Sequence, residues 1–125
     1  MGMRIRNVTR SALALTAAAA AVVLAAPVAN AASARCEIGF RSNACTSGSL
    51  AANASGHWLD YTVEGGGFPC YSADYRVHDS DNGAIVKSGH VGSGSTSGRI
   101  PGLYGRYHIR VYNSCDDAVG TIANS

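Results

Sequence analysis

The chain has 125 residues, with ten basic and eight acidic side chains and a formal net charge of +2. Three of the basic residues lie in the first 31 positions, so the remainder carries seven bases against eight acids. The sequence therefore indicates one small, nearly neutral domain without the clustered basic face that nucleic-acid binding requires, and we expect no nucleic-acid partner.

Residues 1–31 have the pattern of a secretory signal peptide. An arginine-bearing start is followed by an apolar run at 11–28, and Ala29 and Ala31 form the small-x-small site of signal peptidase. A membrane anchor would have to continue through the positions that Pro27 and this site occupy. The sequence therefore favours removal of the segment over its retention as an anchor. We expect cleavage after Ala31, secretion to the extracellular space, and no membrane association afterwards.

Residues 32–56 are rich in small and polar residues and contain few large apolar ones. A brief alternation at 37–41 predicts one short strand, with Ile38 and Phe40 on the same face. We interpret the segment as an N-terminal arm, and expect Ile38 and Phe40 to bind a partner by strand addition. Asn53 begins a glycosylation sequon, a triplet that is common by chance.

All four cysteines lie beyond the predicted signal peptide, and an even number in a small secreted chain predicts two disulfides. Three pairings are possible. We favour Cys36–Cys45 and Cys70–Cys115, because the first pair shares a flexible segment and the second pair flanks strand-like runs. A zinc site would be expected to contain a C-x-x-C pair, and the sequence has none.

From residue 57 onwards, apolar and polar residues alternate with a period of two in four segments, at 57–63, 71–77, 106–112 and 118–122. Glycine-rich stretches at 64–70 and 92–98 read as loops. The residues expected on the apolar faces are Leu59, Tyr61, Val63, Tyr71, Ala73, Tyr75, Val77, Tyr107, Ile109 and Val111.

This pattern predicts an all-β fold, a small antiparallel immunoglobulin-like sandwich of five to seven strands at 57–125, preceded by the arm at 32–56. The segment 100–113 resembles the late-strand signature of immunoglobulin-like and fibronectin-like sandwiches, although the Cys…Trp…Cys arrangement of true immunoglobulin domains is missing.

The stretch 77–90 contains two histidines, two carboxylates and a lysine, and is predicted to be a hairpin. Pairing Val77 with Gly89 gathers the apolar residues on one face and sets Asp79 opposite Lys87. Asn82 then lies in the loop, where positive φ is tolerated.

The same stretch fits no known metal or catalytic motif. An EF-hand counted from Asp79 would have His90 where a glutamate is needed. His78 and His90 are diagonal neighbours in the chosen register, but Arg76 opposite His90 opposes a second cation. The chain also lacks the G-x-S-x-G and H-E-x-x-H motifs. We expect no catalytic residue, no metal and no cofactor.

Other surface side chains could still carry function. A pair of carboxylates that face each other across strands can hydrolyse glycosides, and Asp60 and Asp74 are the candidates for such a pair. We interpret them instead as solubilising surface charges. Trp58 and Tyr112, with Tyr104 as a further candidate, fall opposite the apolar stripe and near arginines, as at protein or sugar interfaces. The alternative for Trp58 is simple burial by a loop.

The layout of 34–48 followed by a β-domain that ends at 107–125 is similar to the small adaptor subunits of the umbrella toxin particles that some actinobacteria secrete. The resemblance implies a non-catalytic adaptor that links a lectin-like subunit to a large toxin-bearing one, and it transfers no site residues. Two alternatives remain open. One is an inhibitor of a secreted hydrolase acting through residues 64–71, although three glycines predict a floppy loop there. The other is a small lectin that stacks sugars on Trp58 and tyrosines.

Overall fold

The computed structural model describes residues 32–125, and the predicted signal peptide lies outside the described residues. The described part forms nine strands and no helix, so it contains no helix that could span a membrane. The strands are β1 (Ser33–Glu37), β2 (Ala44–Thr46), β3 (Leu50–Ala51), β4 (Leu59–Glu64), β5 (Ala73–Asp79), β6 (Ile85–Val91), β7 (Ser95–Ile100), β8 (Arg106–Tyr112) and β9 (Val119–Ala123).

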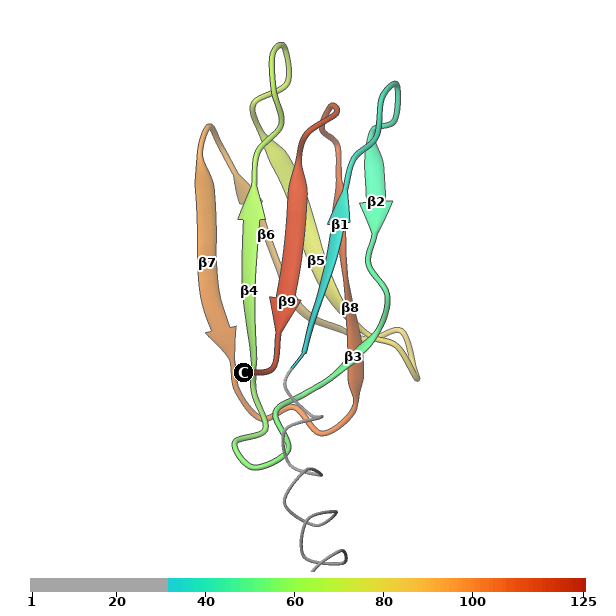
Figure 1. Cartoon of the computed structure of the whole chain (residues 1–125), viewed down its shortest axis with the longest axis vertical. Helices are drawn as coiled ribbons and strands as arrows, with labels where there is room; N and C mark the ends of the chain where they lie inside the picture. The colour runs from blue at the N-terminus through green and yellow to red at the C-terminus, as the bar shows by residue number, and fades with distance from the viewer. Residues whose placement is uncertain (1–31) are drawn as a thin grey trace, which may run out of the picture. The chain divides into compact units, whose positions relative to one another are not determined.

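These strands form two antiparallel sheets that pack face to face (Figure 1). Sheet A has the order β1-β9-β4-β7, and sheet B has the order β2-β8-β5-β6, with β3 also paired to β8. The predicted all-β sandwich is confirmed, and residues 57–125 form six of the strands, within the predicted range of five to seven. The other three strands, β1 to β3, come from residues that the sequence pattern assigned to an arm.

The core lies between the sheets and is built from alternate residues of β4, β5, β8 and β9. Leu59, Val63, Val77, Ile109 and Ile122 have no exposed surface. The predicted inward faces of β4, β5 and β8 are confirmed with one exception. Tyr71 is 50% exposed, because β5 begins only at Ala73.

Residues 32–56 belong to the sandwich and do not form an arm. β1 pairs with β9 at five positions, and β2 and β3 both pair with β8. Ile38 is 1% exposed, its backbone N–H donates to Ala118 O at 2.9 Å, and its carbonyl accepts from Asp117 N at 3.1 Å. Backbone pairing and a disulfide thus order a segment that is poor in large apolar side chains.

The hairpin formed by β5 and β6 is confirmed, but its register differs by two residues from the predicted one. Tyr75 lies opposite Gly89, and Val77 lies opposite Lys87, with an irregularity after Val77. The Tyr75 ring covers Gly89 so closely that a Cβ at that position would lie 2.6 Å from the Tyr75 hydroxyl. The register is therefore set by an aromatic ring that needs a glycine beneath it, and not by the Asp79–Lys87 charge pair.

The predicted loop at 92–98 is shorter than expected, because Ser95–Ile100 forms β7 and pairs with β4 at six positions. Gly98 lies under Tyr61, and a Cβ there would approach the Tyr61 hydroxyl to 2.8 Å. This strand is stabilised by its neighbour and by the ring packed over it, although its own sequence is mostly polar.

Candidate functional site

Three loops leave the same end of the sandwich, beside the short β6–β7 turn: residues 38–43 between β1 and β2, 65–72 between β4 and β5, and 113–118 between β8 and β9 (Figure 1). We call this the three-loop end. Both predicted disulfides are confirmed and both lie here. Cys36–Cys45 spans the base of the first loop, and Cys70–Cys115 joins the second loop to the third.

The three-loop end exposes three aromatic side chains. Phe40 is 80% exposed, Phe68 is 81% exposed and Tyr71 is 50% exposed, which makes three of the five exposed large hydrophobic residues in the described part. The rings of Phe68 and Tyr71 meet edge to face with centroids 6.3 Å apart, and the Arg41 guanidinium lies 5.3 Å from the Phe40 centroid. Aromatic and arginine side chains are the types enriched in protein interfaces.

Backbone hydrogen bonds fix the loop at 65–72. Gly65 N donates to Gly94 O at 2.9 Å, Gly67 N donates to Asp116 O at 3.3 Å, and Cys70 N donates to Gly67 O at 2.9 Å. The loop that was expected to be floppy is thus tied by backbone hydrogen bonds to the β6–β7 turn and to the loop at 113–118. Glycine is needed here because the backbone packs closely, and a Cβ on Gly65 would collide with the carbonyl oxygen of Tyr71.

The predicted partner-binding residues do not form one surface. Phe40 lies at the three-loop end, whereas Ile38 is buried and cannot insert into a partner. Trp58 precedes β4 at the other end of that strand, and Tyr112 lies on sheet B. Phe68 entered the sequence analysis only through the inhibitor alternative. Its position beside Cys70 was the one signal that could have placed it in a fixed loop.

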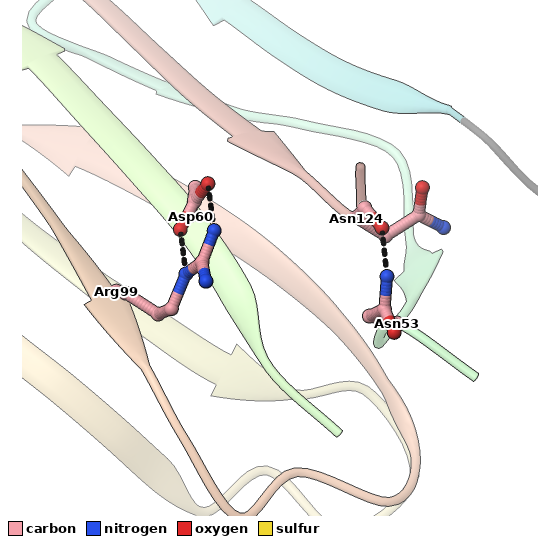
Figure 2. A network of polar contacts seen from close by, with 4 residues as sticks. All are labelled: Asn53, Asp60, Arg99 and Asn124. Atoms are coloured by element: carbon pink, nitrogen blue, oxygen red, sulfur yellow. Dashed lines mark hydrogen bonds and ion pairs between the residues drawn. The ribbon is translucent and has the colours of Figure 1, made fainter. Parts of the chain in front are cut away.

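The Trp58 ring is covered on one face by Arg99, whose guanidinium carbon lies 3.6 Å from the ring centroid. The same guanidinium donates two hydrogen bonds to Asp60, from Nε to Oδ1 at 2.7 Å and from Nη2 to Oδ2 at 3.0 Å (Figure 2). These bonds lower the pKa of Asp60 below its usual value. Asp60 and Asp74 lie in different sheets and do not face each other as a carboxylate pair.

The sequon residue Asn53 has a structural task in the turn before β4. Its Nδ2 donates to the carbonyl oxygen of Asn124 at 2.8 Å (Figure 2). Its Oδ1 accepts from Ser55 N at 3.1 Å and from Gly56 N at 2.6 Å. Asn53 thus ties this turn to the end of β9.

A shallow pocket of about 240 Å³ lies beside the same turn, lined by Asn53, His57, Leu103 and Tyr104 among others. His57 stacks on Tyr104 with ring centroids 4.3 Å apart, and Tyr104 is 78% exposed. The Asn53 side chain is already hydrogen-bonded within the turn and to Asn124. The polar side chains that can still contact a ligand in the pocket are therefore mainly the His57 ring and the Tyr104 phenol. The pocket can therefore contact a ligand, but the residues that line it do not include a nucleophile paired with a base.

The histidines of the hairpin are separated on sheet B. His78 stacks on His108 with centroids 5.2 Å apart, while His90 contacts Asp74 at 2.7 Å. Burial, followed by the charge of His78, lowers the pKa of His108. Asp74, and not the predicted Arg76, lies opposite His90. No group of three His, Cys, Asp or Glu side chains within residues 32–125 is arranged to hold a metal ion.

No family model matches the chain, and no curated protein matches it. Among solved structures, the pre-peptidase C-terminal domain of a collagenase from Bacillus anthracis is 13% identical, with 75% of this chain and 87% of that chain covered and a TM-score of 0.49. The CBM36-1 domain of a multidomain xylanase from the hindgut metagenome of Trinervitermes trinervoides is 14% identical, with 75% and 93% covered and a TM-score of 0.39. Likeness at this level concerns the sandwich architecture and carries no functional conclusion.

Proposed function

We propose that the protein is a secreted, non-catalytic module that binds another exported protein through its three-loop end. The observation that carries the proposal is the exposure of Phe40, Phe68 and Tyr71 on loops that both disulfides hold in place. Exposed aromatic side chains on a pre-ordered scaffold supply contact area at a low entropic cost of binding.

The finer role that we propose is that of an adaptor between subunits of a secreted toxin particle, in keeping with the layout resemblance. In this version the contact is made by loop side chains. Strand addition by an arm is not part of it, because β1 and β2 are already paired within the sandwich. Secretion itself predicts a mature N-terminus at Ala32, and mass spectrometry of protein from culture fluid measures it.

The binding proposal is tested by capture from culture fluid with the tagged mature protein, followed by mass spectrometry of the captured chains. Phe40→Ser and Phe68→Ser should each reduce capture. Tyr104→Ser is the matched control, because Tyr104 is equally exposed but lies outside the three-loop end. Recovery of a toxin-bearing or lectin-like subunit supports the adaptor role. Equal capture by all three variants would place the interface elsewhere.

A second candidate function is inhibition of a secreted hydrolase by residues 65–72. It is favoured by the hydrogen bonds that fix this loop and by the 81% exposure of Phe68 beside a disulfide. Addition of the protein to secreted proteases and amylases tests it. Inhibition lost in Phe68→Ser and kept in Phe40→Ser would support the inhibitor, and an absence of inhibition in every assay would reject it.

A further inference from the structure

Arg76 and Arg110 lie directly opposite each other on β5 and β8, and both are exposed. Like charges at directly opposed cross-strand positions repel each other and destabilise a sheet. The ion pairs within residues 32–125 involve Arg35, His90 and Arg99, so neither member of this couple has a carboxylate partner. The fold thus places two cations side by side without an ion-pair partner for either.

A row of nitrogen-bearing side chains continues from this couple along the outer side of sheet B. His78 and His108 form the next opposed pair, and Arg106 follows on β8, where it donates to Ser49 O at 3.1 Å. We call Arg76, Arg106, Arg110, His78 and His108 the cationic face.

Asp74 and Tyr112 lie beside this charge and offset only part of it. Asp74, at the end of the cationic face, is hydrogen-bonded to Asn113 at 2.8 Å and to His90 at 2.7 Å, and it attracts Arg76 more weakly, through charge alone. The Tyr112 ring lies 5.1 Å from the guanidinium of Arg76 and 5.6 Å from that of Arg110. Cation–π contact eases the repulsion between the two arginines and leaves their net charge unchanged.

The arrangement suits an extended chain of oxyanions. A guanidinium fork matches the two oxygens of a carboxylate or sulfate group, and two opposed forks can hold one such group between them. Arg106 and Arg110 are four residues apart on a strand, which places their Cα atoms about 13 Å apart. A linear polymer with repeated anionic groups can therefore contact both positions at once.

We propose that the cationic face binds an acidic polysaccharide through its carboxylate or sulfate groups. Single-stranded nucleic acid is bound largely by stacking on free aromatic rings, and Tyr112 is instead occupied by two guanidinium groups. Membrane association requires apolar insertion, and neither β5 nor β8 exposes a large apolar side chain. This surface is separate from the three-loop end and does not depend on the function proposed there.

The test measures binding of the mature protein to polygalacturonate and dextran sulfate, with neutral dextran as the blank. We expect binding that weakens with added salt and that falls about tenfold or more in the double variant Arg76→Gln/Arg110→Gln. The double variant Arg35→Gln/Lys87→Gln removes the same charge away from the cationic face and should bind like the unchanged protein. A thermal melt of each variant establishes that the sandwich is retained.

Three outcomes would overturn the proposal. The first is the absence of binding to both acidic polymers. The second is an equal loss of binding in the two double variants, which would indicate a response to net charge alone. The third is tighter binding to a single-stranded oligonucleotide or to anionic phospholipid vesicles than to either polysaccharide, which would assign a different occupant to the cationic face.

Discussion

Arg99 lies flat against Trp58, with 3.6 Å between the guanidinium carbon and the ring centroid, while two of its three nitrogens donate to Asp60. The carboxylate holds the guanidinium in the plane that allows it to stack, so the three side chains act as one unit. Trp58 is the only tryptophan in the chain, and its fluorescence therefore reports this unit alone.

Arg99→Lys should disturb this unit, because an ammonium group can neither stack flat nor bind both carboxylate oxygens. We expect a change in the intensity and wavelength of Trp58 emission and a small fall in melting temperature. Arg35→Lys is the control, since Arg35 makes a single exposed hydrogen bond to Glu37. Unchanged emission in Arg99→Lys would show that the stack is not maintained in solution.

The two disulfides should contribute unequally to stability. Cys70–Cys115 closes a separation of 45 residues and Cys36–Cys45 one of 9 residues. In the chain-entropy description these loops correspond to about 4 kcal/mol and about 2.5 kcal/mol. Paired serine replacements at 70 and 115 should therefore lower the free energy of unfolding more than those at 36 and 45. Denaturant unfolding measures both, and an inverted order would contradict the entropic account.

Gly89→Ala should destabilise the sandwich by roughly 1–3 kcal/mol, because the new methyl group would push the Tyr75 ring into the core. The matched control is Gly92→Ala, where a Cβ would have no neighbour within 4 Å. Urea unfolding of both variants measures the difference. Equal stability would mean that the Tyr75 ring does not rest on Gly89.

Stability should fall as the solution is acidified through the ordinary histidine pKa of 6.5, because the pKa of His108 is lowered in the folded protein. Below 6.5 the unfolded chain binds a proton that the folded chain resists, so stability declines until the pH passes the folded pKa and then levels off. The groups around His108 are the Ser80 hydroxyl, His78 and the arginines Arg76 and Arg110, none of which carries the negative charge that would favour protonation.

Thermal unfolding between about pH 8 and pH 5 measures this dependence. His108→Gln should flatten it, and His78→Gln should reduce it in part by removing the neighbouring charge. An NMR titration that places the pKa of His108 above 6.5 would contradict the sign of the effect.

Ile38 and Phe40 should respond in opposite ways to truncation. Ile38→Ala removes a buried side chain and should cost roughly 2–5 kcal/mol. Phe40→Ala removes an exposed side chain and should leave the melting temperature nearly unchanged while reducing partner capture. Deletion of residues 32–44 should unfold the domain, since it removes β1. A folded deletion variant would restore the interpretation of this segment as an arm.

The strands that the sequence predicts well are those whose own residues alternate, such as Leu59, Tyr61 and Val63 in β4. β1 and β7 cannot be predicted in this way, because their side chains are mostly small or polar. Their formation depends on pairing with the neighbouring strands β9 and β4. Tyr61 over Gly98 and Tyr75 over Gly89 are contacts between strands, and no local period encodes them.

The candidate surfaces divide in the same way. The sequence pattern gives Ile38 and Phe40 the same face, whereas the burial of Ile38 depends on backbone hydrogen bonds to Asp117 and Ala118 near the other end of the chain. The cationic face could not be predicted from the composition, because Arg76 and Arg110 become neighbours only through the β5–β8 register. A nearly neutral net charge does not exclude a local concentration of arginine.

The pairing of β1 with β9 brings together residues 92 positions apart, as in the hydrogen bond from Ala32 N to Asn124 Oδ1 at 2.7 Å. Sheet A cannot close while the last strand is still inside the ribosome or a translocation channel, so the domain acquires its native structure only after the whole segment to residue 124 has emerged. Contacts of such long range form slowly. The topology therefore delays folding until the C-terminal strand is available, which would suit the export that we propose for this chain.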